Sequence, residues 1–138
     1  MKIAFGADEV TELSSAVLGY LRTVAEVVET DMNQPWPSYA RQVGSLVANG
    51  ECDLGVVICW TGTGTSIAAN KVPGVRAALA WDPWIASGAR KWNDANVLAL
   101  SSKRLATDVA VEVTRAFVET TELDMEELPN IEMLRKAH

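Results

Sequence analysis

The run Leu54-Gly55-Val56-Val57-Ile58-Cys59, followed directly by Trp60-Thr61-Gly62-Thr63-Gly64, decides the fold of this chain. Residues 54–59 are apolar or glycine throughout, which is typical of a central strand in a parallel sheet that is covered on both faces. A glycine-rich turn at 61–64 and a short helix predicted over 66–71 follow it. A strand, a tight turn and a helix form the unit from which parallel sheets are built, so this stretch predicts an α/β protein.

The same alternation continues on both sides of this strand. Further strands are predicted at 2–6, 24–28, 75–80 and 96–100, and helices at 11–22, 37–50, 82–92, 107–120 and 124–136, the last interrupted by Pro129. Right-handed crossovers between such strands give a Rossmann-like three-layer α/β/α sandwich with a five-stranded parallel sheet. We expect a single domain over 1–138, with 121–138 as a C-terminal helical tail.

Composition and charge exclude several classes of function. Twelve Lys and Arg face eighteen Asp and Glu, a net charge of -6, and they form no basic stripe, so no nucleic acid is expected as partner. No apolar run reaches the roughly 18 residues of a membrane helix, so no membrane association is expected. The first residues become acidic at Asp8, before a signal-peptide core could form, which predicts a cytoplasmic protein.

The scarcity of histidine and cysteine narrows the chemistry. The single histidine is His138, which disfavours a histidine metal site, a Ser-His-Asp triad and a Cys-His pair. We therefore expect no metal and no cofactor. Two cysteines are too few for a disulfide framework. Cys52 lies on a charged turn and is expected to be inert.

Ligands of such sheets bind outside the carboxyl ends of the strands, so the residues that follow each strand are the candidates. Cys59 ends the most apolar strand, where a lone cysteine is more often a small buried side chain. The neighbouring turn, whose glycines can point amides inward, adds support for the alternative, a reactive thiol. The turn has no Walker lysine and no GxGxxG pattern, so a nucleotide is disfavoured. Asp8 and Glu9 follow the first strand as polyol acceptors or loop acids. Three tryptophans lie near the fourth strand and its helix: Trp81, Trp84 and Trp92. They are expected to lie in the core or at an interface, or to stack on a sugar ring if they face the cleft.

Three collinear motifs carry a family resemblance. They are ICWTGTG at 58–64, SIAANKVPGVRAA at 66–78 and NDANVLAL at 93–100, and residues 1–8 and 37–40 match as well. The chain resembles the type B ribose-5-phosphate isomerase and galactose-6-phosphate isomerase family nearly end to end, fading after about Thr120. It is identified as a divergent member, which implies the same Rossmann-like sandwich and a homodimer or higher homo-oligomer.

The resemblance implies metal-independent aldose-ketose isomerisation through a cis-enediolate. Cys59 matches the base of one subgroup, and Thr65 stands where another subgroup has a glutamate base. Thr61 matches a hydroxyl that supports proton shuttling. The loop residues Gly62, Thr63 and Gly64 match the anion hole for the enediolate oxygen. Asp8 and Asn93 match sugar-binding positions.

The departures from the family pattern predict an altered substrate. Glu9 and Trp92 replace histidines, the latter credited with opening the sugar ring; Trp60 replaces a glycine and Lys103 an arginine. The C-terminal Gly-Arg-His-x-x-Arg phosphate motif is missing, and the acidic run 124–129 stands in its region. We expect an isomerase or epimerase with an acyclic, unphosphorylated or derivatised carbohydrate as substrate.

Two alternative functions stay open. The chain is a non-catalytic or partner-completing subunit beside a paralogous chain, or it is a recruited protein that binds a ligand or uses the thiol or amides for another carbonyl reaction.

Overall fold

The computed structural model describes residues 1–137, and His138 lies outside them. Five strands form one all-parallel sheet: β1 (Lys2–Ala7), β2 (Glu26–Glu29), β3 (Leu54–Cys59), β4 (Ala77–Leu79) and β5 (Val97–Ser101). The strand order is β2-β1-β3-β5-β4, so β3 lies at the centre. The helices are α1 (Glu12–Val24), α2 (Trp36–Ala48), α3 (Thr63–Asn70), α4 (Pro83–Asn93), α5 (Thr107–Glu119) and α6 (Leu128–Lys136), with a 3-10 turn η1 (Met125–Glu127). The predicted α/β sandwich is confirmed.

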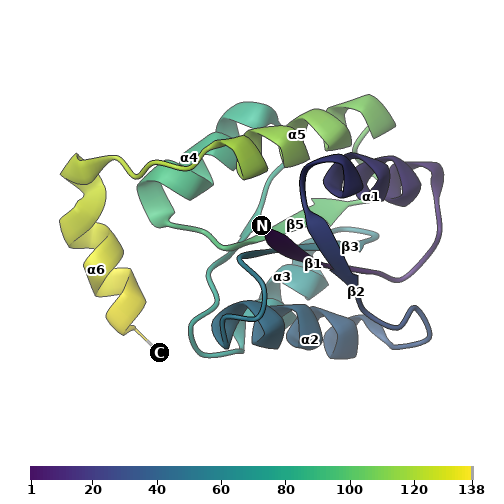
Figure 1. Cartoon of the computed structure of the whole chain (residues 1–138), viewed down its shortest axis with the longest axis horizontal. Helices are drawn as coiled ribbons and strands as arrows, with labels where there is room; N and C mark the ends of the chain where they lie inside the picture. Colours follow the sequence, from purple (N-terminus) through teal and green to yellow (C-terminus); the bar gives the residue numbers. More distant parts are fainter. Residues whose placement is uncertain (138) are drawn as a thin grey trace.

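Helices cover both faces of the sheet, as Figure 1 shows. Helices α1, α4 and α5 lie on one face, where Val17, Phe117 and Leu98 belong to the larger core cluster. Helices α2 and α3 cover the other face, where Val43 and Val57 belong to the second cluster. All six residues of β3 are buried, as its unbroken apolar run predicts.

Several predicted boundaries differ from those observed. The first helix runs on to Val24, which was predicted to be in a strand, and β2 begins at Glu26. The helix α3 begins at Thr63, because Gly62 takes the left-handed conformation of its N-cap. Pro129 does not interrupt the last helix but lies in the first turn of α6, where its missing N–H leaves no hydrogen bond unmade.

The edge strand β4 is shorter than predicted, spanning only Ala77–Leu79. The Asn70 side chain takes up both backbone groups of Ala77: Nδ2 donates to the carbonyl (3.0 Å) and Oδ1 accepts from the amide (2.8 Å). The Asn70 side chain thus occupies backbone groups that another strand would otherwise bind, so it protects the open edge of the sheet from pairing with a further strand.

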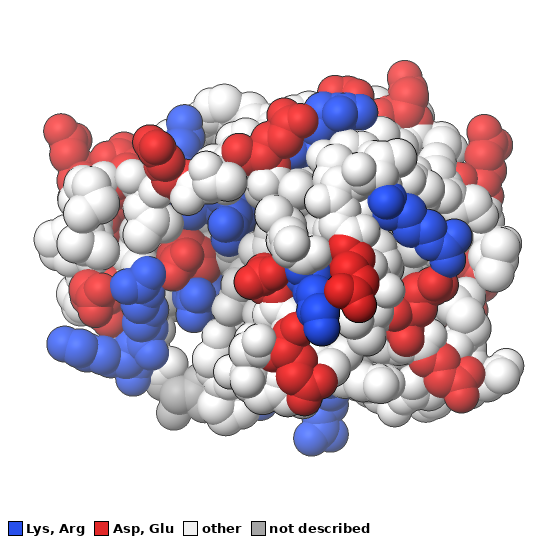
Figure 2. Space-filling model, in the orientation of Figure 1, with Lys and Arg blue, Asp and Glu red and all other residues white. Residues whose placement is uncertain are grey.

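Acidic and basic side chains are intermingled on the face seen in Figure 2. Within residues 1–137, no helix combines the length and the apolar character needed to cross a bilayer.

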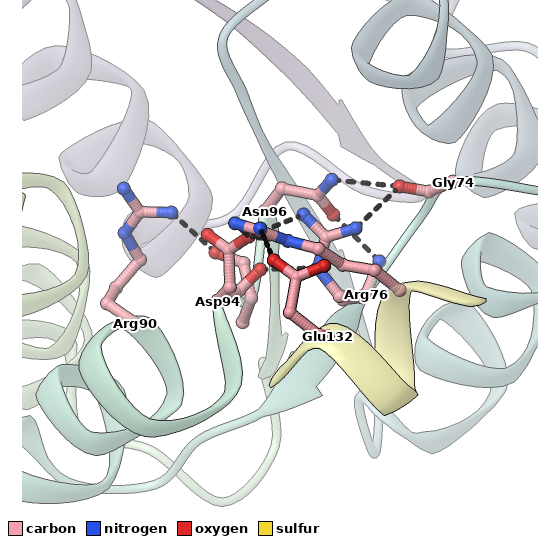
Figure 3. Close-up of polar contacts among 8 residues, drawn as sticks. Gly74, Arg76, Arg90, Asp94, Asn96 and Glu132 are labelled. Carbon is pink, nitrogen blue, oxygen red and sulfur yellow. Dashed lines mark hydrogen bonds and ion pairs between the residues drawn. The ribbon is translucent and has the colours of Figure 1, made fainter. Parts of the chain in front are cut away.

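The C-terminal helix α6 is fastened to the turn between α4 and β5 by Asp94. Arg135 donates to Asp94 Oδ2 from Nε (3.0 Å) and Nη2 (2.7 Å), and Arg76 donates to the same oxygen (3.2 Å). Glu132 accepts from Arg135 Nη1 at 2.7 Å, and Ile131 is buried beneath the helix. Figure 3 shows Asp94, Arg76 and Glu132 at this junction. The helix α6 is thus held against the domain by the Arg135–Asp94 ion pair, in which two guanidinium nitrogens donate, and by the buried Ile131 side chain.

We expect Arg135→Ala to loosen α6 and leave the rest of the fold intact. The pair with Asp94 is partly exposed, with side-chain exposures of 38% and 18%, so its loss should cost about 1 kcal/mol of local stability. Hydrogen exchange of the α6 amides should accelerate about fivefold, while the amides of β3 keep their protection. Lys136→Ala, which removes the same charge one residue along, is the control and should leave α6 protected. Equal effects of the two variants would contradict this role of Arg135.

Candidate active site

Cys59 ends β3 at the floor of a cleft at the carboxyl edge of the sheet. Its side chain is buried, and its Sγ lies 3.3 Å from Oγ1 of the fully buried Thr65. The Thr65 hydroxyl donates to the carbonyl of Gly62 (3.2 Å), so in this arrangement the thiol donates its proton to Thr65. When the thiol loses its proton, the Thr65 hydroxyl can turn to donate to the sulfur. This contact therefore accommodates both protonation states of Cys59.

The strand below Cys59 is held by a buried tyrosine. Tyr39 is fully buried and its hydroxyl donates to the carbonyl of Ile58 at 2.5 Å. Burial raises the pKa of Tyr39 above its ordinary range, and Asp8 and Cys59 act in the same direction when they are ionised. The hydroxyl thus stays a donor and fixes the end of β3 against α2.

The loop after Cys59 carries the amides that could receive an anion. Gly62 has φ 75° at the N-cap of α3, and the first amides of any helix have no partner within it. The Thr63 amide donates to Thr61 Oγ1 at 3.3 Å, so the amides that follow it are the ones open to an anion. The hydroxyls of Thr61 and Thr63 are hydrogen-bonded to each other at 2.6 Å beside these amides. The loop is therefore built as a donor-rich surface directly next to the thiol.

Residues from three neighbouring strands meet at the rim of the cleft. The indole Nε1 of Trp60, after β3, donates to Glu9 Oε1, after β1, at 2.5 Å. The ammonium group of Lys103, after β5, lies 5.0 Å from the centre of the Trp60 ring. The structure thus brings together Glu9, Trp60 and Lys103, which the family pattern had marked only as separate departures.

Asp8 lies below this rim, and its environment disfavours its charged form. Burial is the main cause that raises the pKa of Asp8 above its ordinary value of 3.8, and neighbouring Glu9 adds to it, whereas Lys103 opposes it. The pKa of this carboxyl is higher in the folded than in the unfolded protein. At a pH where it is ionised in both, its charge therefore destabilises the folded state.

We therefore expect Asp8→Asn to stabilise the protein at neutral pH. The folded pKa lies above the unfolded one, so the gain is full at pH 7. It disappears as the pH falls through the folded pKa and below 3.8. Thermal unfolding of both proteins between pH 3 and pH 7 measures the difference. A difference in melting temperature that grows toward low pH would contradict the assignment.

The cleft itself has a volume of about 460 Å³ and is lined by Asp8, Trp36, Cys59, Trp60, Thr61, Thr63 and Gly64. Trp36 follows the second strand, so it lies among the residues after strand ends that the sequence marks as candidates, although no family motif assigned it a role. Its indole packs over Gly64, where an added Cβ would lie 3.0 Å from the ring. Trp36 and Trp60 are 45% and 57% exposed, so each presents ring surface to solvent at the cleft.

Two predicted sugar-binding residues do not reach this cleft in the same chain. Trp92 and Asn93 end α4, just before the amino end of β5, whereas the cleft lies at the carboxyl ends of the strands. The Trp92 ring folds back over Gly88 and packs edge-on against Trp84, with ring centres 5.4 Å apart. Asn93 borders a separate hollow beside α6, with Leu134 and Ala137. Trp92 and Asn93 therefore do not meet Cys59 within one chain, and their part in substrate binding stays a prediction.

A larger hollow of about 630 Å³ lies at the opposite, amino edge of the sheet, beside Arg76 and Arg90. Arg90 donates to the carbonyls of Ala95 and Thr120, and Arg76 is engaged by Asp94 (Figure 3). These guanidinium groups hold turns of the chain together, which is a structural role. The thiol and the loop amides at the carboxyl edge are therefore the better candidate site. Within residues 1–137, no three His, Cys, Asp or Glu side chains gather closely enough to hold a metal ion.

Comparisons with known proteins match this geometry. The sequence model described as Ribose/Galactose Isomerase matches residues 3–134. The chain belongs to the ribose/galactose isomerase family. This confirms the resemblance seen in the motifs, and the chain is an aldose-ketose isomerase of the family's sugar-phosphate type.

Individual members of the ribose/galactose isomerase family cover most of the chain. Ribose-5-phosphate isomerase B of Escherichia coli is 39% identical over 123 residues, 85% of this chain and 83% of that protein. D-erythrulose-4-phosphate isomerase of Pectobacterium atrosepticum is 32% identical over 126 residues, 86% of this chain and 83% of that protein. The solved structure of ribose-5-phosphate isomerase B from Clostridium thermocellum superposes with a TM-score of 0.91 at 32% identity, covering 99% of this chain and 96% of that one.

Proposed function

We propose that this isomerase interconverts the aldose and ketose forms of a short, acyclic sugar phosphate, with Cys59 as the base. The contact between Cys59 Sγ and Thr65 Oγ1, 3.3 Å apart at the floor of the cleft, carries the proposal. By resemblance, positions 59 and 65 are the two at which the family places its base. Side chains from both positions meet at one point, beside the Gly62 carbonyl of the loop.

The proton follows a closed path in this mechanism. The Cys59 thiolate takes the proton from the carbon next to the carbonyl, and the electron pair moves onto the carbonyl oxygen. The resulting enediolate oxygen is stabilised by the amides at the start of α3. Thr61, hydrogen-bonded to Thr63, passes a proton between the two oxygens. The thiol then returns its proton to the other carbon, which completes the isomerisation without any further reactant.

The short substrate follows from what the chain lacks. A four-carbon aldose esterified at its last oxygen cannot close a furanose ring, so no ring-opening acid is needed. The sequence has a single histidine, His138, and Trp92 stands at the position credited with ring opening in the family. The relative from Pectobacterium atrosepticum is described as acting on D-erythrulose 4-phosphate, a four-carbon sugar phosphate. Lys103 at the rim supplies a cation for the phosphate.

Proton NMR in deuterated water tests the proposal. The protein is incubated with four-, five- and six-carbon sugars, each phosphorylated and free, and with Cys59→Ala as control. We expect deuterium to enter C1 or C2 of the four-carbon phosphate only when Cys59 is present. Exchange that persists in Cys59→Ala would contradict the role of Cys59 as the base. Exchange on free sugars alone would contradict the proposal that the substrate carries a phosphate.

A second candidate function is supported by the position of Trp92 and Asn93. Both lie away from the cleft of their own chain, so a site that uses them needs a second chain. The predicted homodimer meets this need, and so does an assembly in which this chain completes the site of a paralogous subunit. Co-purification with such a paralogue supports the second assembly, whereas a homodimer with its own turnover contradicts it.

A further inference from the structure

Trp60 is an exposed tryptophan that is nevertheless held at several points. Its carbonyl accepts from the Ser101 hydroxyl (2.6 Å) and from the Lys103 amide (3.2 Å), which fixes its backbone to the end of β5. Its indole N–H is bound by Glu9, and the Lys103 ammonium lies over the ring. A side chain whose backbone is fixed and whose ring is held on one edge and one face is a fixed wall rather than a mobile surface residue.

This wall lines the same cleft as the Cys59 thiol. The carbons that exchange a proton must lie at the Cys59 thiol, so the remainder of the substrate extends toward the rim. There the indole of Trp60 occupies space that a glycine would leave open, and Trp36 closes another side of the same cleft. The Lys103 ammonium lies over the Trp60 ring, so the cation and the wall stand together at the rim.

We infer that Trp60, locked between Glu9 and Lys103, is a specificity-determining residue that limits the substrate to about four carbons. The inference rests on the proposed function. A phosphate held at Lys103 leaves room for a fixed number of carbons between it and Cys59. A five-carbon chain would have to bend or displace the indole, and the bond from Glu9 opposes that displacement.

The kinetic test compares four- and five-carbon aldose phosphates in three variants. Trp60→Gly removes the wall, and the ratio of kcat/KM for the four-carbon over the five-carbon substrate should fall about tenfold or more. Trp60→Phe keeps a ring beneath Lys103 but loses the bond to Glu9, so its ratio should fall by less. Val24→Ala, which changes an exposed side chain at the end of α1, outside the cleft, is the control and should keep the wild-type ratio. A wild-type ratio in Trp60→Gly would overturn the inference.

A binding test separates this inference from the proposed reaction. Erythritol 4-phosphate and ribitol 5-phosphate are reduced analogues that cannot isomerise, and calorimetry measures their affinities for the wild type and for both Trp60 variants. We expect the wild type to prefer the four-carbon polyol and the variants to lose that preference. Equal affinities or absent binding in the wild type overturn the length limit, even if Cys59-dependent exchange is observed. A preserved preference without exchange refutes only the proposed reaction.

Discussion

Replacing Cys59 by alanine is expected to lower the rate of substrate proton exchange by about 10²–10⁴-fold, the usual contribution of a general base. Thr61 and Thr65 offer only hydroxyls, and the resemblance assigns Asp8, the other titratable group that lines the cleft, to sugar binding, so Cys59 is the side chain proposed to accept the carbon-bound proton and pass it back. The residual rate comes from the loop amides, which stay in place. NMR exchange rates of the two proteins under substrate saturation provide the measurement.

Cys52→Ala is the matched control for this substitution. Cys52 is also buried, but it precedes β3 at its amino end, so the two thiols lie at opposite ends of one strand. We expect Cys52→Ala to keep the wild-type exchange rate. A loss of similar size in both variants would show that thiol removal acts through stability and not through the proposed base.

Substituting Gly62 by alanine should disturb both the fold and the site. Its φ of 75° is strained for any residue with a side chain, and an added Cβ would lie 2.6 Å from Leu79 Cδ1 and 3.0 Å from the Leu100 carbonyl carbon. We expect the free energy of unfolding to fall by about 2–4 kcal/mol. Exchange should fall by about 10²-fold or more in the folded fraction, because the amides at the start of α3 are displaced.

Gly19→Ala is the control for Gly62→Ala, because it adds the same methyl group at a position where there is room for it. Gly19 lies on the exposed side of α1, and an added Cβ would meet nothing within 4 Å. Alanine favours helix over glycine by about 0.5–1 kcal/mol, so this variant should be slightly more stable than the wild type. Urea unfolding of both variants measures the contrast. A Gly62→Ala protein as stable as Gly19→Ala would contradict the close packing at the loop.

The elements of this fold could be predicted from the sequence because their signals are local. The apolar run 54–59 and the periodic stretches between the strands each predict one element, and the family motifs place Cys59 beside its loop. The start of α3 was missed because Gly62 and Gly64 indicated a turn. The conformation of Gly62 instead lets the helix begin immediately after it.

The shape of the site depended on contacts that no local pattern contains. Glu9 and Trp60 are 51 positions apart, and only the pairing of β1 with β3 brings the carboxylate to the indole. Trp36 carried no motif, and its role at the cleft comes from its packing on Gly64. Trp92 and Asn93 matched binding positions in the family, although they precede the predicted fifth strand, and their place at the amino edge of the sheet agrees with that order.

The strand order has a consequence for synthesis on the ribosome. β5 lies between β3 and β4, so β4 has no hydrogen-bonded neighbour until residues 97–101 have emerged. Until then the most apolar strand of the protein stands at an open edge, available to other nascent chains. At about 5–20 residues per second, this interval lasts several seconds. The last strand to arrive also brings Ser101 and Lys103, so the nascent chain completes its sheet and the rim of its cleft in the same step.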